Sequence, residues 1–282
     1  MKKILVPTDF SPNAKHALRV AAILAVKSHA RLGLLHANTA IAYNPAFPES
    51  VFAGMYDATD YYGVAADEFR KLKKELTEEP VFSNLGIDTR VEEGQLYAAV
   101  RRVVEEDEAD LVVMGTKGAA GAAEFFVGSN TEKVIRTAPC PVLAIPENSG
   151  AFELKTVLLA TTLEKDQAAA FRQLAGLQRY WPFKVNVLYL NNPSLFASDE
   201  DIKKTVAAFA KEAELKNVHT FVSGNTFDEE GSILKFAQKE HTDLIVMATH
   251  QRKGVSHLLF GSLTEDTVNH SSIPVLSVPA KP

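Results

Sequence analysis

The stretch Asp110-Leu-Val-Val-Met-Gly115 recurs later in the chain as Asp243-Leu-Ile-Val-Met-Ala248. A second stretch, Pro141-Val-Leu-Ala-Ile-Pro146, recurs as Pro274-Val-Leu-Ser-Val-Pro279 at the same offset of 133 residues. Over the 37 positions that span both stretches, 14 residues are identical without a gap, whereas unrelated segments would share about two. A repeat of this length indicates two copies of one domain.

The copies extend beyond these stretches. The segment Lys3–Asp9 corresponds more weakly to Thr156–Thr162, and the 282 residues amount to two domains of ordinary length. The first copy ends at a short polar segment with a turn-forming glycine, Glu147-Asn-Ser-Gly150. The sequence therefore predicts one domain over 1–148 and a second over 149–282.

Short runs of Val, Ile and Leu alternate in each copy with longer segments of helical period. In the first copy the expected strands are Ile4–Val6, Leu32–Ala37, Thr89–Val91, Leu111–Met114 and Val142–Ile145. The expected helices are Pro12–Lys27, Ala65–Thr77, Tyr97–Glu106 and Thr131–Arg136. Near-continuous apolar strands separated by helices are typical of a parallel sheet covered on both faces. We therefore expect an α/β protein of two tandem doubly wound (Rossmann-like) domains, each with a five-stranded parallel sheet and helices on both faces.

The composition excludes several classes of protein. With 30 basic and 35 acidic residues, the formal charge is −5, so a nucleic-acid-binding or anionic-membrane surface is not expected. No apolar run reaches the roughly 18 to 20 residues that cross a bilayer, and the apolar run after Lys3 stops at Pro7, too soon for a signal peptide. The single cysteine, Cys140, excludes an intrachain disulfide and is expected to be a small core residue. These features favour a cytoplasmic protein.

Ligands of open α/β sheets bind beyond the carboxyl ends of the strands, where the winding reverses. The first expected strand is followed by Asp9, which could accept hydrogen bonds from sugar hydroxyls or base nitrogens. The fourth is followed by a small-residue loop in which Gly115, Gly118 and Gly128 let the backbone approach an anion. Amides at the start of the next helix would bind phosphate, and Lys117 could add positive charge.

The pattern Gly115-x2-Gly118-x9-Gly128-Ser129, with an aspartate after the first strand and a closing Pro-Val-Leu-Ala-Ile-Pro strand, resembles the universal stress protein family. The whole chain looks like its tandem two-domain form. The resemblance implies an ATP site, with Mg²⁺ as a further candidate. It implies contacts to adenosine or phosphates from Pro7, Thr8, Asp9, Ala37, Met114, Gly115, Thr116, Lys117, Gly118, Gly128, Ser129 and Asn130.

The segment that begins at Ser129 also has a purely structural interpretation. Ser129-x-x-Glu132 is also a capping box, which starts a helix without any ligand. Ser262 and Glu265 repeat it in the second copy, so the shared cap is expected to be structural.

The second copy lacks most of the phosphate-binding pattern. Ala248 and Gln251 stand where the first copy has two glycines, and Thr162 replaces the aspartate. We therefore expect the nucleotide mainly in the first domain. The histidines of the second copy lack the spacing of metal ligands, and no metal site is predicted.

No nucleophile with a base falls at the strand ends, so no catalytic residue is assigned. The sequence favours a nucleotide-binding stress-response or regulatory protein over a turnover enzyme. A slow ATPase or self-phosphorylating enzyme remains an alternative, as does a scaffold or small-ligand-binding protein. The scaffold would use the tyrosine-rich segment 38–63, which could be a lid or a surface loop.

The resemblance also implies how the domains meet. Family members dimerise through their last strands, so Val142–Ile145 and Val275–Val278 would pair within one chain as a pseudo-dimer. Such pairing hides both edges. Two chains could associate further as a homodimer.

Overall fold

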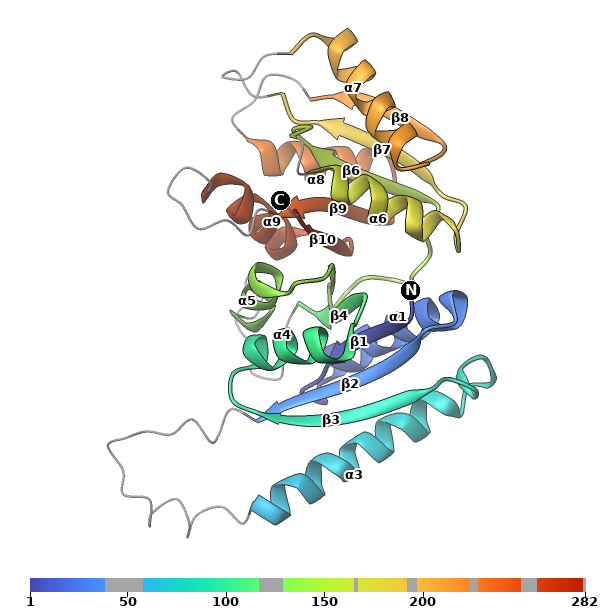
Figure 1. Ribbon diagram of the computed structural model, residues 1–282, viewed down its shortest axis with the longest axis vertical. Coiled ribbons are helices and arrows are strands. Elements are labelled where there is room, and N and C mark those ends of the chain that lie inside the picture. Colours follow the sequence, from blue (N-terminus) through green and yellow to red (C-terminus); the bar gives the residue numbers. More distant parts are fainter. Residues whose placement is uncertain are drawn as a thin grey trace, which may run out of the picture.

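The computed structural model describes residues 1–38, 58–116, 129–164, 167–191, 197–223, 228–249 and 258–280. Helices and strands alternate along both halves of the chain (Figure 1). The N-terminal half contains β1 (Lys3–Pro7), α1 (Pro12–Ser28), β2 (Arg31–Asn38), α3 (Ala58–Thr77), the 3-10 turn η1 (Pro80–Phe82), β3 (Ile87–Glu93), α4 (Leu96–Asp107), β4 (Leu111–Gly115), α5 (Ser129–Thr137) and β5 (Val142–Ile145). The C-terminal half contains β6 (Thr156–Thr161), α6 (Ala168–Gln178), β7 (Lys184–Tyr189), α7 (Asp199–Glu212), β8 (Val218–Val222), α8 (Glu229–Lys239), β9 (Leu244–Thr249), α9 (Leu258–His270) and β10 (Val275–Pro279).

All ten strands form one sheet, in the order β3-β2-β1-β4-β5-β10-β9-β6-β7-β8. Within each half the five strands are parallel, and the halves meet where β5 pairs antiparallel with β10. Leu143 lies opposite Leu276 at this junction. The expected doubly wound α/β fold is therefore confirmed, as is the pairing of the two last strands within one chain.

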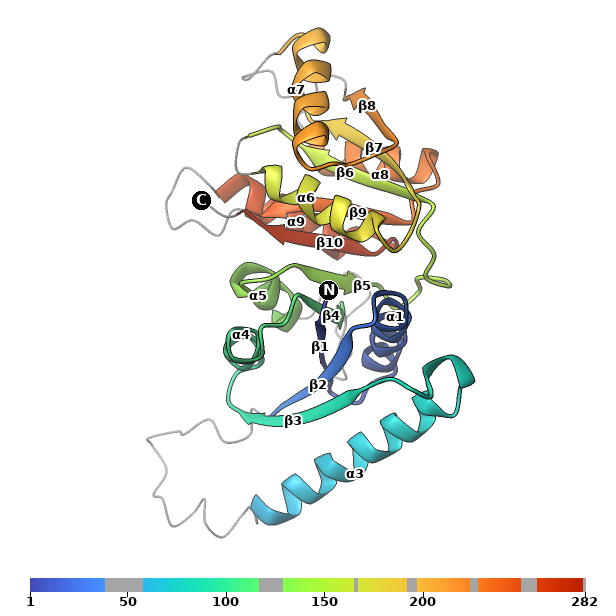
Figure 2. The same ribbon diagram turned by 45° about the vertical axis from the view of Figure 1, so that its right-hand side comes forward.

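Helices cover both faces of the sheet. Alternate strand residues point to opposite faces, so Ile4 and Val6 of β1 join one apolar cluster and Leu5 joins the other. The first cluster lies under α1, α3, α6 and α7, and the second under α4, α5, α8 and α9. Both clusters contain residues of both halves. Across the junction, α5 and α9 lie side by side in both views (Figure 1, Figure 2).

The expected strands and helices of the N-terminal half are all present, but α3 and β3 extend well beyond their expected bounds. Helix α3 begins at Ala58 rather than Ala65, so residues 58–63 of the expected tyrosine-rich loop are helical. Gly63, which reads as a loop residue, faces open space within this helix. Glycine costs only about 1 kcal/mol in a helix, and Phe69 and Leu72 bury the same helix against the core. Residues 39–57 lie outside the described part.

Cys140 is buried, as expected for a core residue. Among the described residues, every helix is too short or too polar to cross a membrane.

Candidate functional site

Three neighbouring strands, β2, β1 and β4, end side by side. Pro7 ends β1, Gly115 ends β4, and Ala37 is the penultimate residue of β2. From β1 the chain winds through α1 to β2 on one side, whereas β4 pairs with β1 on the other side. The winding therefore reverses between β1 and β4, which is where open α/β sheets bind ligands.

The structure gathers most of the candidate residues at this edge. Pro7, Thr8, Asp9, Ala37, Met114, Gly115 and Thr116 lie in or directly after the three strand ends, and Ser129 and Asn130 open α5. Asp9 is exposed, as are the two residues that open α5. The remaining candidates, Lys117, Gly118 and Gly128, lie outside the described residues.

A tight turn follows β1. The buried Thr8 donates its amide to the Leu35 carbonyl at 2.8 Å, and its hydroxyl accepts the Phe10 amide at 3.0 Å. The Asp9 carboxylate accepts the amide of Ser11 at 3.1 Å. Each of these side-chain oxygens bonds the amide two residues further on, as Asx and Ser/Thr turns do.

Helix α1 then begins as its sequence predicts. Ser11 is the N-cap, its hydroxyl accepts the amide of Ala14 at 3.2 Å, and Pro12 occupies the first helical turn. The first turn of this helix also touches β4, because a Cβ built on Gly115 would lie 3.1 Å from the carbonyl oxygen of Asn13. Gly115 therefore has a packing reason for being glycine, independent of any ligand.

Helix α5 is held at the same edge by Thr131, which no sequence motif singles out. Its side chain is buried, and its hydroxyl donates to the carbonyl of Gly115 at 3.0 Å. This bond places the exposed start of α5, Ser129 and Asn130, beside the end of β4. A threonine at the matching position, Thr264, is also fully buried.

The repeated glutamates of the two Ser-x-x-Glu segments lie at the junction between halves. Glu265 accepts from Arg136 at 2.9 Å, and this bond raises the pKa of the arginine. The related contact on the other side joins Asn269 to Glu132 at 3.5 Å. Both contacts link α5 to α9, which gives the repeated glutamate a structural role at the junction between the halves.

At the corresponding strand end of the C-terminal half, a buried glutamine side chain bonds the last residue of β6 and the residue after it. Gln167, buried before α6, accepts the amide of Thr162 at 3.0 Å and donates to its hydroxyl at 2.8 Å. The Thr161 hydroxyl also donates to Gln167. The side-chain amide of Gln167 thus bonds Thr162, the residue that stands where the N-terminal half has Asp9.

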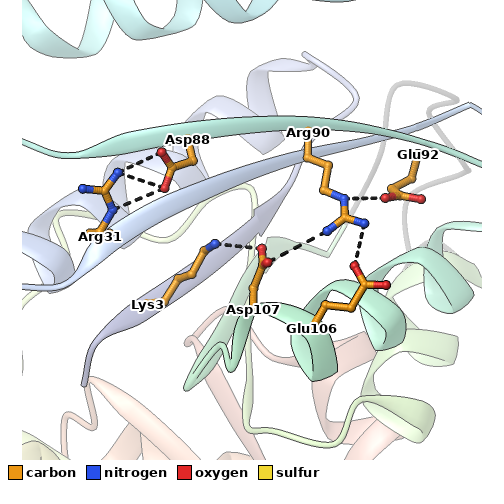
Figure 3. Close-up of polar contacts among 7 residues, drawn as sticks. All are labelled: Lys3, Arg31, Asp88, Arg90, Glu92, Glu106 and Asp107. Carbon is orange, nitrogen blue, oxygen red and sulfur yellow. Dashed lines mark hydrogen bonds and ion pairs between the residues drawn. The ribbon is translucent and has the colours of Figure 1, made fainter.

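A network of charged residues lies elsewhere in the N-terminal half (Figure 3). Arg90 of β3 bonds Glu106 of α4 at 2.6 Å, and this hydrogen bond is the main cause of its raised pKa. Lys3 bonds Asp107 at 2.7 Å. Arg31 bonds the Asp88 carboxylate at 2.8 Å. Lys3, Arg31 and Asp88 lie at or near the amino ends of their strands, whereas Glu92, which bonds Arg90, lies opposite Ala37 near the carboxyl ends.

The universal stress protein family model matches residues 1–146 and again residues 153–279. A universal stress protein in the QAH/OAS sulfhydrylase 3′ region of Thermus aquaticus is 34% identical over 145 residues, covering 51% of this chain and 98% of that protein. The crystal structure of a universal stress protein from Archaeoglobus fulgidus has a TM-score of 0.75 at 16% identity and covers 99% of this chain and 98% of its own. Another match is a universal stress protein in complex with cAMP, at 22% identity, a TM-score of 0.35, and coverage of 52% of this chain and 97% of that one.

Proposed function

The chain belongs to the universal stress protein family, and we propose that its N-terminal half binds an adenine nucleotide, with ATP as the expected ligand. The observation that carries the proposal is the exposed carboxylate of Asp9 at the point where the winding reverses, beside Gly115 at the end of β4. This juxtaposition is where an open α/β sheet binds its ligand. The motif that continues from Gly115 adds the glycines and the helix start that phosphates require.

Each part of the site has a chemical task in this proposal. Asp9 accepts hydrogen bonds from ribose hydroxyls or base nitrogens. The end of β4 brings the backbone close to the phosphates, and the exposed start of α5 at Ser129 and Asn130 offers amides and the positive end of the helix dipole. Ala37, half-buried at the end of β2, lies beside the base.

We propose a nucleotide-responsive stress or regulatory role rather than rapid turnover. Phosphoryl transfer needs several charges that converge on the transition state. Among the described residues, the ends of β1, β2 and β4 contribute one carboxylate, that of Asp9. A protein that only binds the nucleotide needs no such set of converging charges. In that case the nucleotide acts by stabilising the conformation to which it binds.

The substitution Asp9→Asn tests the proposal. It keeps an oxygen that can accept the Ser11 amide, but it removes the negative charge and weakens the acceptor for the nucleotide. We expect ATP to raise the melting temperature of the wild-type protein, and Asp9→Asn to weaken ATP binding about tenfold or more. The measurement is a thermal-shift titration with Mg²⁺-ATP, supported by mass spectrometry of nucleotide released from the denatured protein.

Asp266→Asn is the matched control, because Asp266 is an exposed aspartate of α9 in the other half. It should bind ATP as the wild-type protein does. Equal ATP affinity of Asp9→Asn and wild type would contradict the proposed site, and an unchanged melting temperature of the wild type at millimolar ATP would contradict the proposed function.

A further inference from the structure

Phe10 has a backbone conformation that bulky residues rarely adopt. Its φ is 63°, in the left-handed region, which costs a residue other than glycine on the order of 1 kcal/mol. The residue directly follows Asp9, so its conformation decides where the chain and the carboxylate turn after β1. Neighbouring groups must stabilise this turn.

His36 provides that support from the neighbouring strand. Its Nδ1 lies 2.8 Å from the carbonyl oxygen of Thr8, and because a carbonyl only accepts, the histidine nitrogen must donate. The ring of Phe10 packs at 4.7 Å from the His36 ring and 5.3 Å from that of Phe69. One histidine therefore bonds the residue before Asp9 and packs against the residue after it.

Thr8, the residue before Asp9, is thus held by hydrogen bonds from its amide, its carbonyl and its hydroxyl. The amide of Thr8 donates to Leu35 of β2, its carbonyl accepts from His36 of the same strand, and its hydroxyl accepts the amide of Phe10. Asp9 itself lies between these anchors and is exposed. We propose that His36 is a positioning residue for Asp9: its Nδ1–H holds the Thr8 carbonyl and thereby orients the carboxylate toward the nucleotide.

The C-terminal half has the same left-handed turn, but no histidine stands at the position of His36. Leu163 has a φ of 60°, and its amide bonds the hydroxyl of Thr161 at 2.9 Å, so the same turn forms there. The residue at the position of His36 is Tyr189, which is buried and whose pKa is raised by burial. The left-handed turn therefore belongs to both halves, whereas the histidine accompanies only the half with the carboxylate.

This inference rests on the proposed function, and a double-mutant cycle tests it. His36→Phe keeps an aromatic ring but removes the donor, and His36→Asn keeps a donor nitrogen at the same number of bonds from the backbone but removes the ring. We expect His36→Phe to weaken ATP binding about threefold to tenfold and His36→Asn to retain most of the affinity. In an Asp9→Asn background, His36→Phe should have no further effect, because it acts through the lost carboxylate.

A second measurement needs no nucleotide and separates the two claims. Exchange of the Phe10 and Ser11 amides in the ligand-free protein should be faster in His36→Phe than in His36→Asn. Equal exchange in these two variants, or equal losses of affinity from His36→Phe in both Asp9 backgrounds, would overturn the positioning role. Faster exchange in a protein that fails to bind ATP would instead support the role of His36 in shaping the turn and reject the proposed function.

Tyr189→Phe is the matched control. It changes the residue at the corresponding position of the other half, and ATP affinity should be that of the wild type. A loss of ATP affinity in Tyr189→Phe as large as that in His36→Phe would show that the effect is not specific to the Asp9 turn.

Discussion

Two buried amides of the C-terminal half differ in their bonding. Gln167 is bonded to Thr161 and Thr162, whereas Asn186 on β7 is fully buried and neither its Nδ2 nor its Oδ1 has a partner among the described residues. The position that corresponds to Asn186 in the N-terminal half is Gly33, where an added Cβ would lie 3.2 Å from the Lys3 side chain. An unbonded buried amide destabilises the fold, and a bonded one does not.

The two amides predict opposite effects on stability. Asn186→Leu should raise the free energy of unfolding by about 1 to 3 kcal/mol, because it removes a desolvated amide without breaking a bond. Gln167→Met should lower it by about 1 to 3 kcal/mol, because the amide of Thr162 loses its acceptor. Urea unfolding curves measure both values. Destabilisation by Asn186→Leu would show that this side chain is bonded in solution.

Gly115 predicts an effect on stability that is independent of nucleotide. In Gly115→Ala the new Cβ would lie 3.1 Å from the carbonyl of Asn13, so helix α1 must shift. We expect the free energy of unfolding of the ligand-free protein to fall by about 1 kcal/mol. An unchanged melting temperature without ATP would mean that the glycine serves the ligand alone. A substitution of Asp9 tests the site with less effect on packing than one of Gly115, because Asp9 is exposed.

At the residue scale, the sequence places Asp9 and Gly115 at one edge because both follow strands whose apolar pattern is clear. It does not reveal His36, Thr131 or Gln167. Each of these acts through a contact with another element, and a single histidine or threonine at the end of an apolar run looks like any other core-edge residue. The contrast between Gly115 and Ala248 is visible in the repeat, but its packing cause, the first turn of α1, is not.

At the scale of elements, β3 shows where sequence patterns become weak. The expected strand Thr89–Val91 has three residues, yet β3 spans Ile87–Glu93. Ile87 packs against the core, but the other outer residues are charged, and Asp88 bonds Arg31 of β2 while Glu92 bonds Arg102 of α4. Such charges are typical of an edge strand, which they protect from pairing with other chains.

The Asp88–Arg31 pair predicts a pH dependence. The hydrogen bond from Arg31 lowers the pKa of Asp88, so the native state favours the carboxylate more than the unfolded state does. The stabilisation is present above the ordinary aspartate pKa, near 4, and is lost as the pH falls through the lower native value. Asp88→Asn should therefore reduce the melting temperature slightly at pH 7 and have no effect at the acid end of the range. A difference that persists unchanged at low pH would contradict this assignment.

At the scale of the whole molecule, the two halves share one sheet and both apolar clusters. Contacts between α5 and α9, such as Arg136 with Glu265, add to the paired strands β5 and β10. The repeat predicted two copies of one fold, and the pairing of their last strands followed from resemblance. The repeat alone could not show that the clusters run across the junction, because this depends on how the two copies are oriented.

The shared core predicts cooperative unfolding. Trp181, the single tryptophan, lies in the C-terminal half after α6, and its fluorescence reports on that half, whereas circular dichroism reports on both. The two urea transitions should coincide, and ATP bound in the N-terminal half should shift both. A tryptophan transition that is separate from the dichroism transition and does not move with ATP would show that the halves unfold independently.

Native mass spectrometry of the intact protein with Mg²⁺-ATP shows whether nucleotide binds in the N-terminal half alone, because it counts nucleotides per chain. The Asp9 carboxylate is present only in the N-terminal half, and Gln167 bonds the corresponding strand end of the other half. We predict one ATP per chain, lost in Asp9→Asn and retained in Asp266→Asn. Two nucleotides per chain, or one that persists in Asp9→Asn, would contradict the account.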